Sequence, residues 1–179
     1  MDPIRIYDYL IRSRSYVLRW TGELSDEGYR TEHPIGLGSP ARTLHHMMAA
    51  EWLYMQRIRG RTAPLGDLPH EHDPEVSTAS SLGFADLHAR WMSQQRETRE
   101  DISRSWAGGD DGWNTPLLVS TVFDGNLHEY RASPADIFVQ LIMHEIHHRA
   151  QVLHMLKRSG ISTGEIDFNT LMYMPRVAD

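Results

Sequence analysis

Apolar residues recur at three- and four-residue steps along four long stretches of the chain, the spacing of one face of an α-helix. This pattern predicts a first helix from Ile4 to about Leu24. A second begins at Ser39-Pro40, where serine suits the N-cap and proline the first turn, and it runs to about Arg59. A third spans roughly Thr78 to Trp106, and a fourth runs from Pro134 to Lys157.

The segments between these helices lack helical periodicity. Residues 25–38 and 61–77 are rich in glycine, proline and polar side chains, which predicts surface loops. Residues 116–131 hold two β-prone runs around an Asp-Gly-Asn turn signal, which predicts a short β-hairpin. The apolar stretch from Ile166 to Met174 is predicted to dock on the helices.

These elements predict an all-α fold, an antiparallel four-helix bundle with a short β-hairpin inserted before the last long helix. At 179 residues, the chain is expected to form a single domain, residues 1–179, with a sizeable core.

Composition and charge exclude several classes of function. The formal net charge of −6 argues against general nucleic-acid binding, which needs lysine and arginine to neutralise phosphates. The absence of cysteine excludes disulfides and thiolate ligands, and it suits a reducing cytosol. No apolar run approaches the roughly 18 residues of a membrane span, and the N-terminus shows no signal peptide. We therefore expect a cytoplasmic protein that binds neither nucleic acid nor membranes.

The most informative motif is His144-Glu145-Ile146-His147-His148 in the predicted fourth helix. His144 and His148 are four residues apart, so they differ by about 40° around a helix and point the same way. They lie on the apolar stripe, where imidazoles without partners would cost about 1–3 kcal/mol each. Two inward imidazoles on one face favour half of a metal site, with hydrogen-bonded core histidines as the alternative.

The second predicted helix offers a third imidazole at His45 or His46. Stripe positions do not separate the two, because His46 aligns with small alanines and His45 with a methionine and a tryptophan. Either one, together with His144 and His148, would form a three-imidazole set. Such a set leaves coordination positions open, as in sites that exchange ligands or catalyse reactions. Imidazole accepts Zn, Ni, Cu or Fe alike.

The same motif also satisfies H-E-x-x-H of the zinc proteases, and His154 occupies the third-ligand position of a longer version. That version needs a glycine where this chain has Gln151, which continues the helix and carries His154 to another face. Glu165 is the fallback third ligand for such a site. A di-iron carboxylate site is less favoured still, because the Glu-x-x-His pattern at Glu145 occurs only once.

Segments 43–52 and 144–151 together resemble the DinB-like (DNA-damage-inducible) family, which belongs with the metal-dependent thiol S-transferase and mycothiol-dependent isomerase superfamily. The resemblance covers nearly the whole chain, including the hairpin and the C-terminal tail. It implies a four-helix bundle that binds a divalent metal through three histidines. By position these are His46, His144 and His148.

The resemblance favours His46 over His45, because the family histidine precedes an alanine-rich step and a glutamate five residues on, here Glu51. It implies a homodimer and the transfer of a low-molecular-weight thiol onto an electrophile, and the thiol would come from a cosubstrate. We expect Zn²⁺ or Ni²⁺ as the metal, with Fe or Mn as alternatives. The motif departs mildly at Ala150, where the family usually has glycine.

Three functions stay open at this point: a thiol transferase, a metal-dependent hydrolase including the H-E-x-x-H protease, and a non-catalytic metal-binding bundle. No catalytic residue is assigned. Glu51 and Glu145 are candidates for a general base, although a helical glutamate is more often a solvated surface charge. Gln95 and Thr98 are candidates for the pocket wall, with packing or surface exposure as the alternative. The histidine-rich loop at residues 70–73 is interpreted as solvated.

Overall fold

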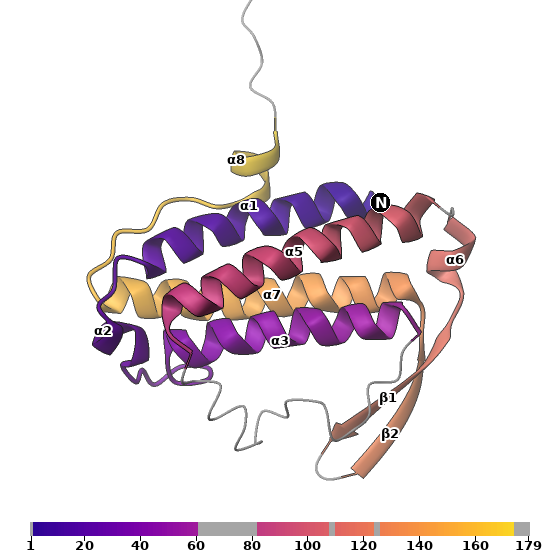
Figure 1. Cartoon of the computed structure of the whole chain (residues 1–179), viewed down its shortest axis with the longest axis horizontal. Coiled ribbons are helices and arrows are strands. Elements are labelled where there is room, and N and C mark those ends of the chain that lie inside the picture. The colour runs from indigo at the N-terminus through magenta and orange to yellow at the C-terminus, as the bar shows by residue number, and fades with distance from the viewer. Residues whose placement is uncertain (1, 61–81, 108–109, 124–125, 174–179) are drawn as a thin grey trace, which may run out of the picture.

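The computed structural model describes residues 2–60, 82–107, 110–123 and 126–173. Within these ranges the protein is mostly helical and contains one two-stranded antiparallel hairpin, as predicted (Figure 1). The predicted loop at 61–77, with its histidines, and the centre of the predicted hairpin turn, 124–125, lie outside the described residues.

Four long helices lie side by side: α1 (Pro3–Thr21), α3 (Pro40–Ile58), α5 (Phe84–Ala107) and α7 (Pro134–Arg158). In three of them the residue before a first-turn proline accepts hydrogen bonds from backbone N–H groups of that turn. These N-caps are Asp2, Ser39 and Ser133. Capping therefore explains why α3 and α7 begin where the sequence predicts.

The helices are not all antiparallel to their neighbours. Both α1 and α3 pack against α5 and α7. The directions are opposite in α1–α5 and α3–α7, whereas α1 runs parallel to α7 and α3 parallel to α5 (Figure 1). The predicted antiparallel order thus holds for two of these four pairs.

Among the described residues, three short helices were not predicted: α2 (Asp26–Arg30), α6 (Asp110–Asn114) and α8 (Phe168–Met172). Each has five residues, too few to show a helical period. The first of them starts at a serine cap, because Ser25 accepts a hydrogen bond from the Gly28 N–H at 3.1 Å.

Two boundaries of the long helices also differ from the prediction. Helix α1 ends at Thr21 rather than near Leu24, because a glycine, a poor helix former, follows it. Helix α5 begins at Phe84, directly after Gly83, and its predicted start near Thr78 lies outside the described residues.

The hairpin precedes α7 and consists of β1 (Leu117–Phe123) and β2 (Asn126–Ala132). Leu117 lies opposite Ala132, and Phe123 lies opposite Asn126. Val119 of β1 is buried in the core, whereas Leu118 is exposed. The hairpin thus packs one side of β1 against the helices.

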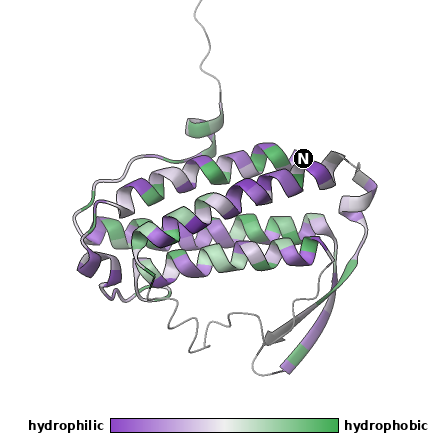
Figure 2. Cartoon of the chain, in the orientation of Figure 1, coloured by the Kyte–Doolittle hydropathy of each residue, from purple (hydrophilic) through white to green (hydrophobic). Residues whose placement is uncertain are grey.

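Apolar side chains of the long helices form two core clusters. One cluster surrounds Leu44 and Trp91, and the other surrounds Leu10 and Phe138. Figure 2 shows α5 as largely hydrophilic, which fits its role as a cover with a narrow apolar face. Among the described residues, no helix combines the length and apolarity needed to cross a bilayer.

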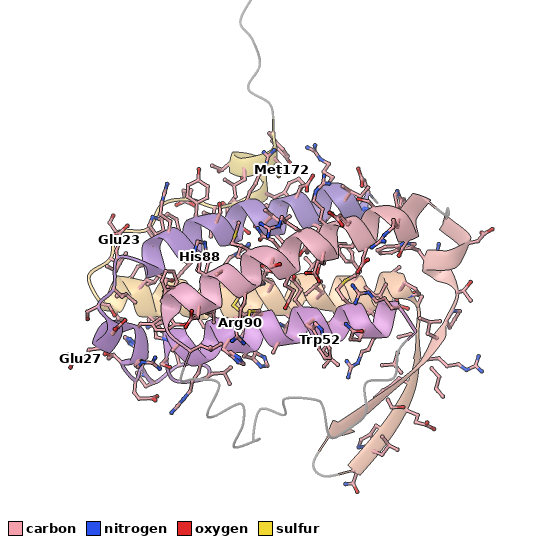
Figure 3. The ribbon with its side chains drawn as sticks, viewed as in Figure 1. Glu23, Glu27, Trp52, His88, Arg90 and Met172 are labelled. Carbon is pink, nitrogen blue, oxygen red and sulfur yellow. The ribbon has the colours of Figure 1, made fainter. Side chains whose placement is uncertain are left out.

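The C-terminal tail docks on α1, as predicted. The Tyr9 hydroxyl donates to the carbonyl of Ile166 at 3.2 Å, and its ring lies 5.1 Å from that of Phe168. Met172 of α8 is buried at the same junction (Figure 3). The tail therefore closes one side of the helical core.

Candidate metal centre

Three histidines from two helices meet between α3 and α7. His46 comes from α3, and His144 and His148 come from successive turns of α7. One ring nitrogen of each lies within 4.8 Å of the other two, and His46 Nε2 is 2.8 Å from His144 Nε2. The ring centroids are 4.4 to 4.8 Å apart. The structure thus brings together the three residues that the sequence predicts as ligands.

This donor set fits a divalent metal ion. Zinc–imidazole bonds of about 2.0–2.1 Å in a tetrahedron place ligand nitrogens about 3.3 Å apart. The nitrogen separations in the cluster lie on both sides of that value, so small rotamer shifts would complete a site. His46 and His144 are half-buried and His148 is buried. Three protein ligands with partial exposure leave room for an exchangeable ligand.

The His144 ring is electrostatically suited to ligation. Burial, followed by the charges of His148, His46 and His147, lowers the pKa of His144 from 6.5 to about 3. His144 therefore stays neutral near neutral pH and keeps the lone pair that a metal ligand needs.

His45 lies outside the three-histidine group. Burial, followed by the charge of Arg90 on α5, lowers the pKa of His45. Its Nδ1 is buried without a hydrogen-bond partner among the described residues. The structure thus groups His46, rather than His45, with the histidines of α7.

Glu51 and Glu145 are not surface charges, so the interpretation of a solvated helical glutamate is wrong for both. Their exposed fractions are 0% and 2%. Arg14 of α1 is also buried and donates to both carboxylates, reaching Glu145 Oε2 at 2.6 Å. We call these three residues the Arg14 network.

Further hydrogen-bonding groups surround the Arg14 network. The Tyr7 hydroxyl donates to Glu51 Oε1 at 2.9 Å, and the Thr98 hydroxyl donates to the same oxygen at 3.2 Å. Gln95 Oε1 accepts from Arg14 Nη1 at 3.3 Å. Gln95 and Thr98 therefore lie in the polar interior of the protein. This position favours the packing role over a place in a pocket wall.

Opposite charges keep Arg14 ionised. Burial disfavours the charged arginine, but Glu145 and Glu51 hold the pKa of Arg14 well above its ordinary value. Burial raises the pKa of Glu145, and Arg14 opposes that shift. Sequence reasoning missed this network, although Arg14 stands on the apolar stripe of α1 four residues after Leu10.

The pairing of Glu145 bears on the metalloprotease alternative. In an H-E-x-x-H site the glutamate works as a base beside the metal. Here both oxygens of Glu145 accept from Arg14, at 3.3 Å and 2.6 Å. His154 and Glu165, the proposed third ligands of that alternative, are exposed and outside the histidine group. The geometry of this motif is therefore not formed.

Comparison with known proteins gives one family. The sequence model of the DinB family matches residues 2–176, almost the whole chain. A search of curated proteins gave no match.

Proposed function

This chain belongs to the DinB family, and on that premise we propose that it is a divalent-metal protein that transfers a low-molecular-weight thiol onto an electrophile. His46, His144 and His148 would hold the metal, with Zn²⁺ or Ni²⁺ preferred. The observation that carries this proposal is the convergence of their ring nitrogens within 4.8 Å. The four long helices would form the four-helix bundle of the family, in the reducing cytoplasm.

The residues of the cluster support a thiol as the ligand. Three neutral imidazoles leave the full charge of a divalent ion uncompensated, which favours an anionic ligand in an open position. A bound Zn²⁺ or Ni²⁺ would act as a Lewis acid that activates a thiol or a water molecule near neutral pH. The chain contains no cysteine, so the thiol would come from a cosubstrate.

The Arg14 network favours the thiol over water as the nucleophile. A hydrolase commonly uses a carboxylate as a general base beside the metal. Glu145 is the carboxylate nearest in sequence to the ligands, and Arg14 holds it in the interior. Among the described residues, the group that could hold a metal contains histidines alone. A thiol ionises far more readily than water and so needs a base less.

We also propose a homodimer. Met143 and Ile146 of α7 are large apolar residues with exposed fractions of 64% and 42%, and both lie within two residues of His144 in the sequence. A contact between copies would remove this surface from water. Light scattering of the wild type and of Met143→Glu tests it: a dimer that the substitution weakens supports the proposal, and a wild-type monomer contradicts it.

Metal content is the decisive measurement. We expect elemental analysis to find one divalent metal per chain in the wild type and a loss in His46→Ala, His144→Ala and His148→Ala. The matched control is His45→Ala, which removes the neighbouring histidine and should retain the metal. Loss in the control and retention in His46→Ala would contradict the assignment of the ligands.

Activity is then measured on the metal-loaded protein with pairs of thiols and electrophiles. Thiol transfer that His148→Ala abolishes, with the fold intact, would support the transferase. Hydrolysis alone would favour the hydrolase, and binding without either reaction would favour a non-catalytic metal protein.

A further inference from the structure

Gln151 of α7 lies between two histidines, one of which is a proposed ligand. His148 Nδ1 is 2.8 Å from Gln151 Oε1, and Gln151 Nε2 is 2.9 Å from His147 Nε2. An amide oxygen only accepts and an amide NH₂ only donates. His148 therefore donates from Nδ1, and its lone pair is on Nε2.

Helix geometry makes this bridge possible. His147 and His148 precede Gln151 by four and three residues, so all three lie on neighbouring positions of one helix surface. His148 is buried, Gln151 is half-buried and His147 is exposed. The bridge thus runs from the metal centre outward to solvent.

The turn before α3 covers the amide from the other side. Gly36 has a φ of +56°, in the left-handed region that favours glycine. A Cβ built at Gly36 would overlap the side-chain oxygen of Gln151 and lie 3.1 Å from Nε2. The backbone N–H of His33 donates to the carbonyl of Gly38 and closes this turn. The backbone therefore lies directly against the amide and limits its rotation.

We infer that Gln151, held by His147 and by the turn at Gly36, is a positioning residue that fixes the tautomer and ring orientation of His148 in the metal centre. The inference rests on the proposed metal site. Ligating histidines commonly donate their other ring N–H to an oxygen acceptor, and removal of that acceptor lowers metal affinity about 10–100-fold.

Zinc affinity tests the acceptor directly. With Zn²⁺ as the probe in competition with a chromophoric chelator, Gln151→Leu should raise the Kd about 10–100-fold. Gln151→Glu should recover most of the affinity, because a carboxylate also accepts from His148 Nδ1. The control His154→Leu removes an exposed histidine from the same helix and should leave the Kd unchanged.

A pair of glycine substitutions tests the turn. Gly36→Ala would place a methyl group against the amide, whereas Gly160, with a φ of +82°, has open space around its Cβ position. Both alanines should strain the backbone and lower the melting temperature. Only Gly36→Ala should weaken zinc binding, because only it displaces Gln151.

The tautomer of His148 gives a readout that needs no metal. In the metal-free wild type, ¹⁵N chemical shifts should show the Nδ1–H tautomer, and Gln151→Leu should give a mixture. An Nε2–H tautomer in the wild type would overturn the inference. So would wild-type zinc affinity in both Gln151→Leu and Gly36→Ala, and the metal site would then still stand. A wild type that binds no zinc would instead overturn the proposed function, and this inference with it.

Discussion

Helices α3 and α7 contribute to two polar clusters, the histidine cluster and, with α1, the Arg14 network, and the two satisfy their polar groups in opposite ways. In the Arg14 network one buried guanidinium bonds two buried carboxylates, and the hydroxyl of Tyr7 adds a further donor. In the histidine cluster three rings face one another, and two of them are half-buried. In the Arg14 network, groups of opposite charge contact one another. In the histidine cluster, three basic rings contact one another.

This difference separates a structural role from a binding role. Buried ions are tolerated when opposite charges and hydrogen bonds surround them, and the planar fork of arginine can serve two carboxylates at once. Converging neutral imidazoles compete for few donors, an arrangement that a cation would relieve. We conclude that the Arg14 network holds α1, α3 and α7 together, while the histidine cluster could hold a metal ion.

Removal of Arg14 should have the largest effect. Arg14→Met would leave Glu51 and Glu145 buried without their cation. We expect the free energy of unfolding to fall by about 3–5 kcal/mol, because such charges lose compensation while they stay desolvated. Urea unfolding of the metal-free protein measures this loss.

A matched variant separates charge from packing. Arg14→Met combined with Glu51→Gln and Glu145→Gln removes all three charges, so it should regain much of the lost stability. A loss below about 1 kcal/mol in Arg14→Met alone, the scale of an exposed ion pair, would contradict the role given to the network.

Metal should stabilise only through the histidine cluster. At a Zn²⁺ concentration of about 100 times Kd, binding to the folded state raises the free energy of unfolding by about 2.7 kcal/mol. We expect this gain in the wild type and in His45→Ala, and none in His46→Ala or His144→Ala. Urea unfolding with and without zinc measures this gain. An equal gain in His46→Ala would contradict the assignment of the histidine cluster as the zinc site.

The helices of the site could be predicted, because their starts and faces are encoded locally. Ser39 and Ser133 precede prolines and cap α3 and α7, and the four-residue spacing of His144 and His148 places both on one face. The choice of His46 over His45 did not follow from local pattern. It depends on the rotation of α3 about its axis, which packing against α5 and α7 decides.

The Arg14 network could not be predicted, because its members lie on different helices and charged residues usually face water. The only local cue is an arginine on the apolar stripe of α1, after Leu10 and before Val17. The parallel pairing of α1 with α7 likewise joins the first and last long helices of the chain, so neither helix alone encodes it. The interior chemistry of the fold is therefore set by long-range contacts.

Acid should destabilise the metal-free histidine cluster. The pKa of His144 is lowered to about 3 in the folded protein and is about 6.5 when unfolded. At a pH between about 3 and about 6.5, His144 binds a proton in the unfolded chain but not in the folded chain. Stability is therefore lost as the pH falls below about 6.5, by at most about 1.4 kcal/mol per pH unit.

His144→Gln should remove this contribution to the pH dependence. Urea unfolding in chelator, from about pH 7 down to about pH 5, should show a shallower loss of stability in the variant than in the wild type. Equal slopes would mean that His144 is not the group that resists protonation.

The smallest effect should come from an exposed ion pair between α1 and α5. Arg99 Nε is 2.6 Å from Asp8 Oδ1, and the two side chains are 45% and 31% exposed. Water and salt screen such a pair, so Arg99→Ala should cost only about 0.2–1 kcal/mol, and less at high ionic strength. Removal of the buried Arg14 guanidinium should lower the free energy of unfolding several times more in the same urea assay. Equal losses would mean that the buried Arg14 network contributes no more to stability than an exposed ion pair. The distinction between this network and the histidine cluster would then rest on their geometry alone.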